Sequence, residues 1–314
     1  MKVSGAAEGQ FRSVTQCLNP TESPHIEAHT RGRTMKIPKI FEHFHQGQIF
    51  TIEEAKQKLN SHGNTLRKRL SELASRGYIR PLRQGLYQMC VITTGDPIFP
   101  FEPFAIAAKL TPFGAISFGT ALYHHCGSAI NMPTIYLQSP SKFNSFQLEG
   151  VHFVWCHSNE ATGLLTLEKE LVGQLYPFLL TTVERTLIDC LKKPLFAPNP
   201  NHMVALSRSL PYSPNLMKML RYAFMGAEPP PFFNRLGFYL ESLQNHWAVP
   251  QDVLDGLKAK ANPRCTPWYH TRGRPSEIHF TPTIQKDLAD SVWENPCLSQ
   301  KWNLTFEGGL HQGT

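Results

Sequence analysis

Apolar residues recur at helical spacing in three consecutive segments of the first third of the chain. The first segment, residues 36–46, has its apolar positions on one helical face: Ile37, Ile40, Phe41 and Phe44. In the second, Thr51 stands three residues before Glu54, which is the spacing of a capping box and predicts a helix over residues 52–59. A turn over residues 60–63 follows, because it ends in glycine.

The third segment predicts a helix over residues 65–76, capped by Asn64 and ended by Gly77. Its apolar stripe consists of Leu66, Leu70 and Leu73. Two short apolar runs then flank Arg83, Gln84 and Gly85, a pattern typical of a β-hairpin with glycine in the turn. Helix, turn, helix and basic hairpin in this order predict a winged helix-turn-helix.

In a winged helix-turn-helix, the second helix of the pair enters the major groove of DNA, and the hairpin reaches phosphate. Residues 36–90 hold ten lysine and arginine residues against four acidic ones, so they carry about +6 of the chain's net charge of +7. A basic charge confined to one small domain suits phosphate neutralisation. The residues expected to contact DNA are Asn64, Thr65, Arg67, Lys68, Ser71, Arg80 and Arg83.

The remaining chain predicts a mixed α/β domain with a helical C-terminal part, which makes the fold class α+β. Proline and glycine in residues 91–103 mark a linker. We expect strands over residues 114–117, 134–138 and 151–156, and helices over 104–110, 118–126, 182–191, 203–210, 215–225 and 232–247. We also expect a strand over 278–280, a helix over 283–293 and a closing strand over 301–305. The expected domains are 1–35, 36–95 and 96–314.

Four segments in this order resemble the AbiEi family of antitoxins, which regulate abortive-infection toxin-antitoxin operons. They are residues 50–87, ending in RGYIRPLRQGLY; residues 117–127, SFGTALYHHCG; residues 182–189, TVERTLID; and residues 234–241, NRLGFYLE. The sequence departs from the family at Gln84, where arginine is usual, and at Val183, where proline is usual. The resemblance covers roughly residues 36–250 and does not extend over residues 251–314.

The resemblance implies a transcriptional autoregulator and antitoxin. Its winged helix would repress its own operon at inverted repeats in double-stranded DNA, and its second domain would counteract a nucleotidyltransferase-like toxin. It implies no enzymatic activity and no cofactor.

Two side-chain groups in the second domain could carry chemistry. Arg185 and Asp189 are four residues apart and can pair on one helical face, so with Glu184 we expect a structural or partner-binding role for them. The alternative is a DNA-acting nuclease that uses Glu184 and Asp189; a free-standing regulator without a toxin is a further alternative. Adjacent His124 and His125 point in different directions on a helix, so we expect no metal site there.

Composition restricts the location of the protein. No apolar run approaches a membrane span, and the first residues hold no apolar leader segment. The odd number of seven scattered cysteines suits reduced thiols, so we expect a cytoplasmic protein. Residues 1–34 lack periodicity and are expected either to form a disordered tail or to precede the true start of translation at Met35.

Overall fold

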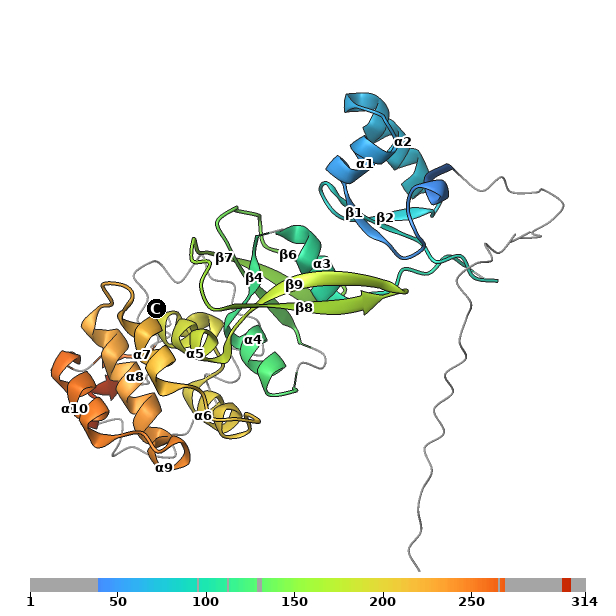
Figure 1. Cartoon of the computed structure of the whole chain (residues 1–314). Helices are drawn as coiled ribbons and strands as arrows, with labels where there is room; N and C mark the ends of the chain where they lie inside the picture. The colour runs from blue at the N-terminus through green and yellow to red at the C-terminus, as the bar shows by residue number, and fades with distance from the viewer. Residues whose placement is uncertain are drawn as a thin grey trace, which may run out of the picture.

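The structure, a computed structural model, describes residues 39–94, 96–111, 113–128, 132–264, 266–268 and 301–305. The N-terminal extension, and the strand and helix expected within residues 278–293, lie outside the described residues. The protein is an α+β fold in which a small N-terminal module, a mixed sheet and a group of helices follow one another (Figure 1).

The N-terminal module contains two helices packed on a three-stranded antiparallel sheet with strand order β1-β3-β2. Its elements are η1 (Lys39–Glu42), β1 (Ile49–Thr51), α1 (Ile52–Lys58), α2 (Gly63–Ser75), β2 (Ile79–Arg83) and β3 (Leu86–Met89). The predicted stripe of α2 is buried against Phe44, Phe50 and Ala55, which form the core of this module. The hairpin is confirmed, and Gly85 has the left-handed φ of 79° that its turn requires.

Two expectations for this module are wrong. Residues 39–42 form a short 3-10 helix, and the chain then turns at Gly47 into β1, so no α-helix extends to Gln46. Strand β1 had not been expected. Helix α2 begins at Gly63 with His62 as its N-cap, so Asn64 lies in the first turn and does not cap the helix.

The capping box at the start of α1 is confirmed. The Thr51 hydroxyl accepts from the Glu54 amide at 3.2 Å, and the Glu54 carboxylate accepts from the Thr51 amide at 2.7 Å. Burial raises the pKa of Glu54, but its hydrogen bonds from Lys109 and Thr51 outweigh this effect and bring the pKa below its ordinary value. Glu54 therefore remains a carboxylate at neutral pH.

Replacing Thr51 with alanine should lower the free energy of unfolding of the module by about 1 kcal/mol, because the Glu54 amide loses its side-chain acceptor. Thr65→Ala is the matched control, since Thr65 is exposed in the first turn of α2 and makes no capping bond. Thermal unfolding of both variants measures the difference. Equal melting temperatures would show that the box contributes nothing to stability.

The six-stranded sheet has the order β6-β7-β5-β4-β9-β8. Its strands are β4 (Ala115–Ile116), β5 (Thr134–Ser139), β6 (Phe146–Leu148), β7 (Val151–His157), β8 (Leu164–Leu171) and β9 (Gln174–Thr181). Strand β4 pairs in parallel with β9, and β5 pairs in parallel with β7; the other pairs are antiparallel. The strands expected near β4, β5 and β7 are confirmed, whereas β6 and the long β8–β9 hairpin were missed.

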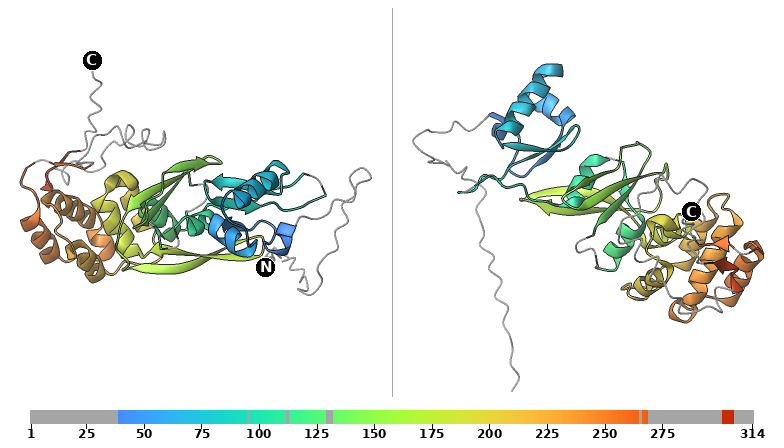
Figure 2. Two further views of the ribbon diagram at one scale, coloured as in Figure 1. Left: turned by 90° about the horizontal axis from the view of Figure 1, so that it is seen from above. Right: turned by 180° about the vertical axis from the view of Figure 1, so that it is seen from behind.

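Helices α3 and α4 lie beside this sheet. The helices from α5 onward form a group at the end of the sheet that is farther from the N-terminal module (Figures 1 and 2). Their bounds are α3 (Pro103–Leu110), α4 (Phe118–His125), α5 (Val183–Lys192), η2 (Pro194–Phe196), α6 (Pro200–Arg208), α7 (Leu216–Phe224), α8 (Pro230–Ser242), α9 (Gln244–Trp247) and α10 (Gln251–Lys260). The expected helix over 232–247 is thus divided at Leu243, and α10 was not expected.

At the end of the described chain, β10 (Thr266–Pro267) pairs in parallel with β11 (Leu304–Thr305), which confirms a short strand within the expected residues 301–305. Trp302 is fully buried in the helical core, beside α8 and α10. In the part of the chain that the structure describes, no helix is both long and apolar enough to cross a membrane.

Candidate functional site

Helix α2 turns an uninterrupted polar face to the solvent. Five of the residues expected to contact DNA lie on its exposed surface, while its three leucines pack inward: the exposed residues are Asn64, Thr65, Arg67, Lys68 and Ser71. Figure 1 shows α1 and α2 on the side of the small sheet that faces away from β8 and β9. The face of α2 is therefore accessible over its whole length.

The cations of this face are not ion-paired within the described part of the chain. Arg67 and Lys68 form no ion pair with any residue that the structure describes. Lys58 on the neighbouring helix behaves differently, because it donates to the His43 carbonyl at 2.8 Å and lies over the Phe44 ring. The unpaired charges of α2 are free to meet an anionic partner such as phosphate.

The β2–β3 hairpin packs against residues 143–149 of the six-stranded sheet and its loops. The Arg83 guanidinium lies 5.4 Å from the ring centroids of both Phe143 and Phe146, and burial lowers its pKa. Arg80 is ion-paired with Glu149 and also donates to Gln88 at 3.0 Å. In this arrangement of the chain, residues between β5 and β7 contact both arginines, which are partly buried. A phosphate contact by Arg80 or Arg83 stays a prediction.

Further contacts fix the module against the six-stranded sheet. Leu82 and Leu86 of the hairpin belong to the apolar core of that sheet, as does Ile49. The Tyr176 hydroxyl accepts from the Ile49 amide at 2.9 Å, and Lys109 of α3 pairs with Glu54 of α1 at 2.6 Å. One face of the small sheet is thus occupied by the second domain, which leaves α2 as the exposed basic element.

The Arg185–Asp189 pair is confirmed, with Arg185 Nε 3.3 Å from Asp189 Oδ2. The Arg185 side chain is only 2% exposed. Gln138 completes the group, because its amide donates to Asp189 at 2.8 Å and its oxygen accepts from Arg185 at 2.7 Å. Arg185 also donates to the carbonyls of Glu160 and Thr162. This network ties α5 to β5 and to the loop before β8.

Burial raises the pKa of Asp189, while the Arg185 guanidinium and the Gln138 amide oppose the rise. Glu184 lies at the first turn of α5 and accepts from the Asn215 amide at 3.1 Å. The two acids that a nuclease would use therefore have structural partners on different neighbours. Sequence reasoning missed Gln138, although a glutamine inside an otherwise apolar strand was a usable signal.

The two histidines of α4 and the nearby cysteines do not form a reactive or metal-binding group in the described part of the chain. His125 is partly buried, and its Nε2 lies 2.7 Å from the Thr181 carbonyl oxygen. Burial raises the pKa of Cys126, and it raises that of Cys156 to about 12, so neither thiol is activated. Among the described residues, no three histidine, cysteine or acidic side chains are grouped as metal ligands.

Comparisons with known proteins add little to this picture. No protein-family model matches the chain, and no curated protein matches it. Among solved structures, the chain is similar to the crystal structure of the RV2827C protein from Mycobacterium tuberculosis, at 16% sequence identity and a TM-score of 0.49. That similarity covers 82% of this chain and 85% of the other.

Proposed function

We propose that the N-terminal module is a winged helix-turn-helix that binds double-stranded DNA through α2. The observation that carries this proposal is the exposed face of α2, on which Arg67 and Lys68 have no charged partner among the described residues. Their positions in the first two turns are those from which a recognition helix contacts base edges. The sheet order and the preceding capped helix suit the same motif.

The contacts of Arg80 and Arg83 bear on which element of the module would contact the bases of DNA. Both belong to the hairpin that packs on the six-stranded sheet, so α2 provides the base contacts and the hairpin provides rigidity. The second domain then fixes the angle at which α2 is presented. This distribution differs from a wing that reaches independently to phosphate.

We further propose that the chain is a transcriptional autoregulator and antitoxin of the AbiEi type. This part of the proposal rests on the ordered resemblance of residues 50–87, 117–127, 182–189 and 234–241. The partner would be a nucleotidyltransferase-like toxin. The packed positions of residues 185–189 and 235–240 give these motifs a structural purpose, which is to join the sheet to the helical end.

Alanine at Arg67 or Lys68 should reduce the preference for operator DNA over scrambled DNA, because a side chain on a base edge contributes about 1–3 kcal/mol of discrimination. If a residue contacts phosphate instead, both duplexes weaken alike and the salt slope falls by about one unit. Fluorescence anisotropy with the duplex upstream of the gene and its scrambled version, at two salt concentrations, measures both quantities.

Arg221→Ala is the matched control, since Arg221 is exposed on α7 at the other end of the molecule. Arg83→Ala tests this structural role of the hairpin. It should lower the melting temperature of the full chain, because the contacts with Phe143 and Phe146 are lost, and it should have little effect on the salt slope of DNA binding. Wild-type DNA binding by an Arg67→Ala/Lys68→Ala variant would refute the proposed interface.

A further inference from the structure

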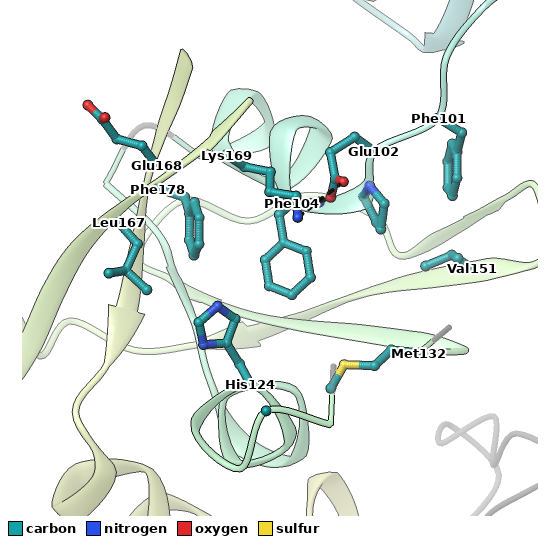
Figure 3. Close-up of a pocket in the computed structure, with 12 residues that line it drawn as sticks. Phe101, Glu102, Phe104, His124, Met132, Val151, Leu167, Glu168, Lys169 and Phe178 are labelled. Carbon is teal, nitrogen blue, oxygen red and sulfur yellow. Dashed lines mark hydrogen bonds and ion pairs between the residues drawn. The ribbon is translucent and has the colours of Figure 1, made fainter. Parts of the chain in front are cut away.

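A cavity of about 700 Å³ lies beside the second sheet, between the start of α3, the end of α4 and the strands β8 and β9. Three rings that pack on one another form one wall: Phe104 is 5.4 Å from Phe178 and 5.7 Å from His124, between ring centroids. Leu167 and Met132 extend the apolar lining (Figure 3). Such a lining suits a flat apolar body rather than a hydrated one.

Lys169 brings a positive charge to this cavity. Its ammonium lies 3.7 Å from the Glu102 carboxylate, and its side chain is 48% exposed, so most of its hydrogen-bonding capacity is unused. Glu102 is already engaged, because its other oxygen accepts from the Phe104 amide at 3.1 Å as the cap of α3. The Glu168 carboxylate points away from the rings in Figure 3.

His124 adds a neutral polar group to the same wall. Burial lowers its pKa, as do His125 and Lys169, so the imidazole carries one N–H donor at neutral pH. Its ring makes no hydrogen bond to any residue that the structure describes, although its neighbour His125 does. The donors of His124 and Lys169 thus have room for an acceptor from outside the chain.

We propose that this cavity binds a small aromatic carboxylate. The aromatic body packs on Phe104, Phe178 and Met132, and the carboxylate accepts from the Lys169 ammonium and the His124 N–H. A cationic ligand fits less well, because Glu102 is engaged and Glu168 is turned outward. This site is separate from α2, so it goes beyond the proposed DNA-binding function.

Helix α3 connects this cavity to the N-terminal module. Helix α3 begins at the cavity with Glu102 and ends near Lys109, which pairs with Glu54 of α1. A ligand that displaces Glu102 from Lys169 acts on the first turn of the helix that contacts α1. Binding of the carboxylate itself does not depend on this coupling.

Isothermal titration of the full chain with 2-naphthoate, without DNA, tests the proposal. We expect saturable binding that weakens about tenfold to a hundredfold in Lys169→Ala, because a charge-assisted hydrogen bond is lost. Lys142→Ala is the matched control, since Lys142 is exposed and lies over Trp155, outside the cavity lining. Leu167→Trp should weaken binding by narrowing the cavity beside Phe178. The neutral analogue 2-naphthamide should bind at least tenfold more weakly than the acid.

Three results would overturn the proposal. The first is the absence of saturable binding to the wild-type chain. The second is equal affinity of wild type and Lys169→Ala, or of naphthoate and naphthamide. The third is unchanged binding in a Leu167→Trp variant with a wild-type melting temperature. Lys169 is half exposed, so its alanine variant folds and stays informative even if the tryptophan variant does not.

Discussion

Replacing Arg185 with alanine is expected to lower the free energy of unfolding by about 3–5 kcal/mol, the usual loss when one partner of a buried ion pair is removed. The change leaves the Asp189 carboxylate buried, with the Gln138 amide as its one remaining hydrogen-bond donor among the described residues. It also removes the donors that the carbonyls of Glu160 and Thr162 accept from. Calorimetric or denaturant unfolding of the full chain measures the loss.

Two comparison variants separate this network from an ordinary surface arginine. Arg221→Ala should change stability by less than about 0.5 kcal/mol, since Arg221 is exposed on α7. Arg185→Lys should fall between alanine and wild type, because lysine restores the charge but not the planar fork that reaches Gln138 and two carbonyls. If Arg185→Ala is as stable as wild type but fails to neutralise a toxin, residue 185 is a partner contact instead.

Gly237→Ala is expected to destabilise the helical end by about 3 kcal/mol, through displacement of Trp302. A Cβ on Gly237 would overlap the indole ring of Trp302, which is fully buried against α8. The indole ring cannot shift easily, because its Nε1 donates to the Glu241 carboxylate at 2.6 Å. The Trp302 backbone carbonyl is also held, since it accepts from the Asn234 amide at 2.6 Å. Thermal unfolding and the tryptophan emission maximum report the two consequences.

Gly256→Ala provides the matched control for this change. Gly256 lies within α10, and a Cβ there meets no atom within 4 Å. The helix preference for alanine over glycine then predicts a gain of up to about 1 kcal/mol. The same substitution should therefore have opposite signs at the two positions. A neutral Gly237→Ala variant with unchanged emission would show that α8 tolerates a methyl group beneath Trp302.

The sequence by itself determined the elements whose stabilising contacts are local. The capping box of Thr51 and Glu54, the leucine stripe of α2 and the turn at Gly85 each depend on residues only a few positions apart. The same holds for Arg185 and Asp189, which are one helical turn apart. Spacing along the chain specifies such interactions before any tertiary contact forms.

The β8–β9 hairpin was not predicted, because its sequence carries two local signals against regular strands. Charged residues within β8, including Glu168 and Lys169, interrupt the apolar alternation that marks a half-buried strand. Strand β9 carries Pro177, which argues against a central strand, yet it pairs with β8 along its length and with β4 at Leu179 and Leu180. Tertiary pairing overrode both local signals.

The tertiary structure alone decided which basic residues of the N-terminal module face the solvent. Arg83 resembles Arg67 in sequence terms, since both stand close to a turn in a basic segment. Arg83 nevertheless lies on Phe143 and Phe146, about sixty residues further along the chain, whereas Arg67 has no such neighbour among the residues that the structure describes. Gln138 joined Arg185, and the rings of Phe104 and His124 met beside Lys169, for the same reason. Contacts between distant segments depend on how the sheet brings its strands together, and no spacing within one segment encodes them.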